Sequence, residues 1–139
     1  MTAATADRNT VRREGQVLEV PMKAAAKIYA GTMVVVDAAT NLAIPAKTGL
    51  GLKSVGVSQC QCDNSTGLDG EARVRVFRGP EVLYRMSNSA AGDLIVLGDI
   101  GADCYLVDDQ TVAKTNGSNA RSVAGKVRDV DSVGVWVEF

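Results

Sequence analysis

Hydrophobic and polar positions alternate with a period of two in several short segments of this chain. The clearest case is 73–78, where Val74 and Val76 are expected to point to one side and Arg73, Arg75 and Phe77 to the other. Alternation of this kind is typical of a β-strand that lays one face on a core. The segment therefore predicts a strand that is buried on its valine side.

Residues 100–139 repeat this pattern and predict four short strands divided by turn residues. In the last of them, Val133, Val135 and Val137 alternate with Gly134 and Trp136, so one face is expected to be wholly aliphatic. Asp, Asn and Gly favour turns because their side chains bond the local backbone or permit positive φ. On this basis we expect the chain to turn at 108–110, 116–119 and 129–132.

The earlier part of the chain predicts further strands at 16–20, 33–36, 42–46, 52–61 and 81–86. The segments 33–36 and 42–46 are expected to pair as a hairpin, and Val55 and Val57 are expected to face the same way. Pro21 suits a strand end or an edge strand because it lacks an N–H donor. Residues 22–27 are expected to be extended or to form one turn, and 87–101 to form a short strand or a helical turn.

Composition supports an all-β fold and adds a domain estimate. The chain has 139 residues, of which 46% are hydrophobic but only 4% aromatic, and it contains 14 glycines. This length suits one domain, and a Val-rich, Gly-rich composition suits many short strands. We predict a small β-barrel or β-sandwich of roughly ten short strands over residues 16–139, preceded by an extended arm at 1–15.

Charge and hydropathy exclude several classes of partner. The net charge is −1, which does not favour phosphate-driven binding to nucleic acid. The sequence contains no apolar run near the roughly 18 residues that a bilayer-spanning helix needs, so we expect no membrane partner. The first residues lack the apolar region of a secretory signal, which predicts synthesis in a cytoplasm.

The sequence does not suggest an enzyme. It contains no histidine, the usual proton carrier near neutral pH, and none of the phosphate-binding or nucleophile motifs that mark common active sites. The adjacent carboxylates Asp108 and Asp109 fall on a predicted turn, where such groups are usually solvated. We therefore predict no catalytic residue and no cofactor.

The three cysteines and one acidic loop are the candidates for a metal site. A closed zinc site usually takes four Cys or His ligands, and this chain has three cysteines. We therefore expect Cys60 and Cys62 to pack as small apolar groups on one core face, and Cys104 to be buried. The loop 63–70 carries several oxygen-bearing side chains but lacks the spacing of a calcium loop, so we expect a plain surface turn and no metal.

An ordered series of short motifs resembles the capsid cement (head decoration) proteins of tailed bacteriophages. The series covers roughly residues 20–139, and no single motif in it is specific. The motifs are Ile28-Tyr29-Ala30-Gly31-Thr32, Val55-Gly56-Val57, the loop 63–70, Asp99-Ile100-Gly101 with Cys104-Tyr105, and Gly125-Lys126-Val127 with Gly134-Val135-Trp136-Val137-Glu138.

This resemblance implies a structural virion protein that performs no reaction. It would be made in the host bacterium, bind the outer surface of the assembled head, and clamp neighbouring capsomers of the major capsid protein. It would also self-associate, as a trimer. Two alternatives remain open from the sequence: another phage structural part, such as a tail or head-fibre base, and a module that binds the host surface.

Six residues are candidate contacts with the capsid or with a second copy, namely Arg8, Arg12, Arg13, Arg73, Arg75 and Trp136. The first three lie in the segment 1–15, which is either a disordered terminus or an arm that folds onto a partner. Arg73 and Arg75 are either solvated or part of a basic strip that binds carboxylates through their planar guanidinium groups. Trp136 is either an interface anchor or a core filler.

Overall fold

The computed structural model describes residues 3–139, and within them the chain forms twelve β-strands and two short 3-10 turns. This confirms the all-β class predicted from the sequence. The N-terminal elements are β1 (Val17–Pro21), β2 (Lys27–Ile28), β3 (Met33–Asp37), β4 (Leu42–Pro45), β5 (Leu52–Ser58), β6 (Cys62–Asp63) and β7 (Arg73–Phe77). The C-terminal elements are β8 (Leu83–Asn88), η1 (Ala91–Asp93), η2 (Leu97–Asp99), β9 (Asp103–Leu106), β10 (Thr111–Ala113), β11 (Val123–Val130) and β12 (Val135–Glu138).

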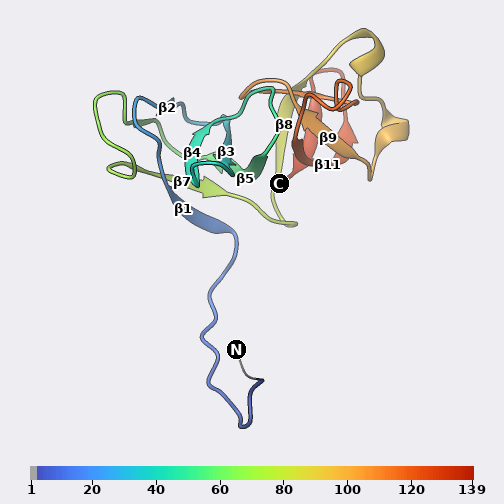
Figure 1. Ribbon diagram of the computed structural model, residues 1–139. Coiled ribbons are helices and arrows are strands. Elements are labelled where there is room, and N and C mark those ends of the chain that lie inside the picture. The colour runs from blue at the N-terminus through green and yellow to red at the C-terminus, as the bar shows by residue number, and fades with distance from the viewer. Residues whose placement is uncertain (1–2) are drawn as a thin grey trace.

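The strands form an open sheet beside a small closed barrel (Figure 1). The open sheet has the strand order β1-β7-β5-β3-β4. Strands β2 and β6 form a separate two-stranded sheet. The barrel has the order β10-β8-β12-β11-β9, in which β10 and β8 are parallel and the other neighbours that are described are antiparallel. Within residues 3–139, no helix has the length and apolar character needed to cross a membrane.

Strands of the open sheet follow the predicted pattern closely. In β7, Val74 and Val76 are fully buried while Arg73 and Arg75 are exposed. Strands β3 and β4 pair as the predicted antiparallel hairpin. Pro21 ends β1, which is an edge strand, where a missing N–H donor leaves no hydrogen bond of the sheet unmade.

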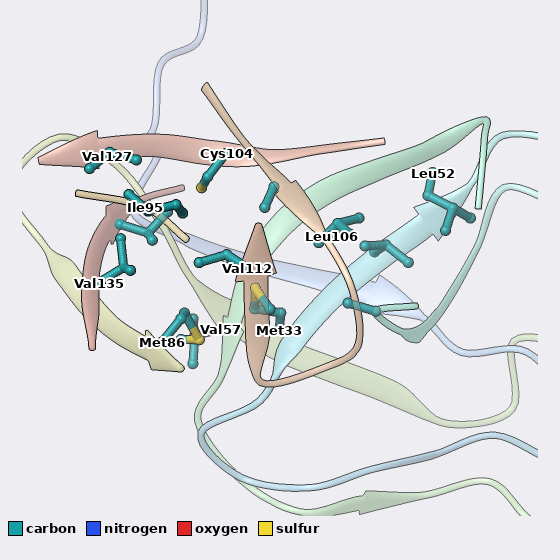
Figure 2. Packing of buried hydrophobic residues seen from close by; sticks show 14 of the residues in the cluster. Met33, Leu52, Val57, Met86, Ile95, Cys104, Leu106, Val112, Val127 and Val135 are labelled. Atoms are coloured by element: carbon teal, nitrogen blue, oxygen red, sulfur yellow. The ribbon is translucent and has the colours of Figure 1, made fainter. Parts of the chain in front are cut away.

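Two hydrophobic cores lie on opposite faces of the open sheet. Strand β3 contributes to both, because Met33 and Val35 join one core and Val34 joins the other. The larger core continues into the barrel, where it includes Leu106 and Val112 (Figure 2). The period of two that predicts each strand thus also divides its side chains between two cores.

The prediction that Val55 and Val57 face the same way is wrong. Val55 packs in the smaller core and Val57 in the larger one. Gly56 between them has φ of +129°, and the register of β5 on β3 shifts at this point. A bulge of this kind inserts an extra residue and turns the following side chain to the other face.

Two details of the C-terminal strands also differ from expectation. Val133 does not share the aliphatic face of Val135 and Val137, because it lies outside β12 and is 65% exposed. The turn expected at 129–132 begins later, since β11 continues to Val130 through a bulge. The carboxylate of Asp131 then accepts hydrogen bonds from two backbone amides and forms the turn.

Of the two alternatives expected for 87–101, a short strand or a helical turn, the structure shows helical turns, η1 and η2, and between them Ile95 enters the barrel. Ile95 is only 1% exposed and belongs to the larger core, and Figure 2 shows it among the barrel strands. Asp99 accepts a hydrogen bond from the amide of Val96 and so braces η2. Gly101 follows with φ of +90°, the left-handed corner that glycine adopts without strain.

Side-chain and backbone hydrogen bonds join the barrel to the open sheet. The Ser122 hydroxyl accepts from the Leu52 amide at 3.1 Å and donates to the Gly49 carbonyl at 2.8 Å. The Met33 amide donates to the Asp109 carbonyl at 2.7 Å. Together with the shared core, these bonds make the two parts one packed body.

Candidate binding surfaces

The N-terminal segment leaves the body as an extended arm. Residues 3–15 are exposed, and no hydrogen bond or ion pair found within the described chain joins residues 3–14 to the strands. The attachment begins at Gly15 and Gln16, whose carbonyls accept from the side chain and backbone of Arg78. Figure 1 shows the arm running from β1 away from both sheets. Residues 1 and 2 of the predicted arm lie outside the described residues.

The arm carries three of the candidate contact residues. Arg8, Arg12 and Arg13 are exposed, and none of them forms an ion pair with the described part of the chain. Their guanidinium groups are therefore available to carboxylates of a partner. That they bind one stays a prediction.

Arg73 and Arg75 are instead tied to the neighbouring edge strand. Arg75 forms an ion pair with Glu19 at 3.2 Å, and Arg73 donates to the Glu19 carbonyl at 3.1 Å. Both partners of the ion pair are about half exposed, so the pair adds little to stability. The two arginines are exposed on the side of β7 opposite Val74 and Val76, but part of their hydrogen-bonding capacity is already used.

Trp136 lies on the outer face of the barrel and does not fill the core. Its indole N–H donates to the Asp131 carboxylate at 2.8 Å, and this bond is the main reason that the pKa of Asp131 lies below its ordinary value. The Arg85 guanidinium lies over the ring, 5.7 Å from its centroid. Trp136 thus fixes the 131–134 turn, and a role at an interface stays a prediction.

The largest sequence-local group of exposed apolar side chains lies between η1 and the start of β9. We call residues 94–100 the apolar turn segment. Its exposed members are Leu94, Val96, Leu97 and Ile100, which are 44%, 44%, 62% and 49% exposed. Exposed apolar groups that gather in one place mark interaction sites more often than scattered ones do.

Hydrogen bonds and ion pairs hold this segment in one conformation. The Asn88 side chain donates to the Ile95 carbonyl at 2.8 Å and accepts from the Ile95 amide at 3.0 Å. Asp93 binds Arg121 and Asp99 binds Lys114, each at 3.0 Å. A partner that buried the segment would therefore lose little conformational entropy in ordering it.

These ion pairs predict a loss of stability in acid. Hydrogen bonds from Thr115 and Arg121 lower the pKa of Asp93 below its ordinary value, so its ionised form stabilises the fold above about pH 4. That contribution disappears as pH falls through the lowered pKa. We expect the urea midpoint to fall less steeply below about pH 4 in Asp93→Asn than in the wild type. Asp7→Asn on the arm is the control, and equal slopes for all three proteins would contradict the assignment.

The prediction that both Cys60 and Cys62 pack on a core face is wrong. Cys60 is exposed and Cys62 is only partly buried, because β6 is two residues long and Cys60 lies in the bend before it. Cys104 is fully buried, as predicted, and burial raises the pKa of its thiol to about 12.

The described part of the chain shows no assembled metal site. Among residues 3–139, no group of three or more His, Cys, Asp or Glu residues is placed to hold a metal ion. Burial, together with the neighbouring Asp108, raises the pKa of Asp109, but this carboxyl lies on a turn beside the sheet. The absence of a catalytic residue stays a prediction.

Comparison with protein-family models, with curated proteins and with solved structures finds no match to this chain. Sequence reasoning also missed the apolar turn segment, although a signal was present. Four consecutive apolar residues, 94–97, follow neither the period of two nor a helical period. Such a run inside a polar region indicates that some members are buried while others are exposed.

Proposed function

We propose that this chain is a capsid cement protein that binds the outer surface of an assembled phage head and holds neighbouring capsomers together. The observation that carries the proposal is the arm, which offers three arginines beyond the folded body. The ordered motifs between Ile28 and Glu138 give it a family context through their resemblance to cement proteins. The major capsid protein is the proposed partner.

A protein that clamps two capsomers needs two separate surfaces, and this chain offers two. The arm leaves the open sheet at β1, whereas the apolar turn segment belongs to the barrel (Figure 1). The first surface is basic and adaptable, and the second is apolar and held rigid by Asn88. Binding to the assembled lattice alone would stabilise that lattice by mass action, without any reaction.

Self-association as a trimer is part of the proposal. The open sheet ends in β1 on one side and β4 on the other, and the described contacts along the β4 edge are a bridge between Met22 and Ala43 and a hydrogen bond from the Lys23 amide to the Ala43 carbonyl. A neighbouring copy or a capsid loop would cover such edges, which otherwise invite uncontrolled strand pairing. Sedimentation of the purified chain, alone and on heads, measures the oligomeric state directly.

Uptake of the purified chain by heads that lack it tests the proposed function. We expect cosedimentation with the heads, and we expect a chain without residues 1–15 to stay folded but bind poorly. Leu97→Asp should weaken binding about tenfold, because it places a charge in a buried apolar contact. Leu50→Asp is the matched control, since Leu50 is 66% exposed on a different loop.

Two results would overturn the proposal. One is that heads take up none of the wild-type chain at concentrations that saturate a specific site. The other is that virions contain only a few copies, located in the tail. Equal binding of the wild type, the arm-deleted chain and Leu97→Asp would instead show that neither surface contacts the head.

A further inference from the structure

Cys60 and Cys62 form a pair of facing thiols at the edge of the smaller core, against which Cys62 packs while Cys60 is exposed. The proposed head contacts use neither thiol. Their Sγ atoms are 3.5 Å apart. Two residues of a regular strand that are two positions apart are separated by about 6.6 Å along the strand, so a straight strand would not bring the sulfur atoms this close. The bend at Gln59 and Cys60 turns the first thiol toward the second.

The surrounding fold holds this arrangement in place. The buried Ser58 hydroxyl donates to the Cys60 carbonyl at 2.6 Å, and the Gln59 amide donates to the Arg75 carbonyl of β7 at 3.1 Å. Cys62 is fixed on the other side, because it pairs with Ile28 in the two-stranded sheet of β2 and β6. These contacts fix the backbone of the bend and of β6, from which the two thiols project.

A bond between these sulfur atoms is within reach but strained. A disulfide has an S–S length of about 2.05 Å, so the atoms must approach by about 1.5 Å. The ring so formed encloses a single intervening residue, Gln61, and this leaves little freedom to reach the preferred dihedral angle. Strained and exposed disulfides are the easily reduced ones, which suits reversible exchange and not permanent crosslinking.

We propose that Cys60 and Cys62 form a dithiol site that exchanges with low-molecular-weight disulfides of the glutathione class. The Cys60 thiolate attacks one sulfur of the oxidised disulfide, forming a mixed disulfide and releasing one thiolate. The Cys62 sulfur, after losing its proton to solvent, attacks the Cys60 sulfur and releases the second thiolate. The protein dithiol is oxidised by two electrons, and the small disulfide is reduced to two thiols.

The environments of the cysteines set this order of events. Cys60 is exposed and can meet a disulfide from solution, whereas Cys62 is partly buried behind it. In the reduced protein, burial, followed by the hydrogen bond and charge of Cys60, raises the pKa of the Cys62 thiol. Burial still acts after Cys60 has formed the mixed disulfide, so the closing step should become faster as pH rises. Cys104 is fully buried and should not react while the protein is folded.

Intact-mass and peptide measurements on the folded chain in oxidised glutathione test the proposal. The wild type should lose two hydrogen atoms, retain no glutathione, and yield a peptide with a Cys60–Cys62 bond that dithiothreitol cleaves. Cys62→Ser should accumulate one glutathione on Cys60, because the closing step is removed. Cys60→Ser should remain largely unmodified, and Cys104 should stay unmodified in every protein.

Phenylarsine oxide, a dithiol-selective trivalent arsenical, provides a second measurement that requires no variant of the protein. It should bridge Cys60 and Cys62 of the native wild type, with one arsenic bound to both sulfurs and one water released per bridge. The proposal is overturned if the wild type ends as a stable mixed disulfide or as a dimer linked through Cys60. It is equally overturned if both reagents leave the two cysteines unmodified.

Discussion

Replacing Gly56 with alanine is expected to destabilise the protein by about 3–5 kcal/mol. A Cβ atom at this position would lie 2.2 Å from the Phe77 carbonyl oxygen and 2.9 Å from its carbon. The φ of +129° adds strain, because residues with a side chain rarely adopt this conformation. Since β5 and β7 pair at this point, neither backbone can move without breaking the open sheet.

Urea unfolding of Gly56→Ala, followed by circular dichroism, checks this expectation. Gly98→Ala is the matched control, because its Cβ would meet no atom within 4 Å and its φ is not positive. If Gly98→Ala changes the free energy of unfolding little and Gly56→Ala lowers it strongly, the loss of stability arises at the bulge. A Gly56→Ala protein as stable as the wild type would show that β5 does not need the bulge.

Replacing Ile95 with alanine is expected to cost about 3 kcal/mol and to loosen the apolar turn segment. Ile95 is 1% exposed and packs with Val127 and Val135 in the larger core (Figure 2). Removing its outer carbons leaves a cavity at the point where the segment is anchored to the barrel. The bonds from Asn88 to the Ile95 backbone would then hold the segment without its apolar anchor.

Val96→Ala is the control for this substitution, because the Val96 side chain, next to Ile95 in the sequence, is 44% exposed and its truncation leaves no cavity in the core. Chemical denaturation gives the loss of stability, and amide hydrogen exchange over residues 94–100 reports the loosening. Similar stabilities for the two variants would contradict the assignment of Ile95 to the core. Unchanged exchange in Ile95→Ala would show that Asn88 alone fixes the segment.

The strands were predictable because each carries its own periodic signal. Val74 and Val76 identify β7, and the alternation before Phe139 identifies β12, without reference to any other part of the chain. The prediction for β5 was wrong at a point where this strand meets another. The bulge at Gly56 depends on the approach of Phe77, a residue far along the chain, so a pattern read within β5 cannot reveal it.

Binding surfaces were less predictable than strands because exposure is a property of the folded chain. Leu97 and Ile95 are chemically alike and two positions apart, yet one is exposed and the other fills the barrel. Cys60 and Cys62 were expected to share a core face, but a two-residue strand leaves Cys60 in the bend. The arm was predictable as a segment, since its polar composition gives it nothing to bury.

The position of β12 in the barrel has a consequence for synthesis on the ribosome. This strand is the last in the sequence, but it lies between β8 and β11 and provides Val135 and Val137 to the larger core. Translation delivers the chain from the N-terminus, so the barrel cannot close until Glu138 has left the exit tunnel. The open sheet can form earlier, and β8 and β11 then each lack one neighbouring strand until β12 joins them.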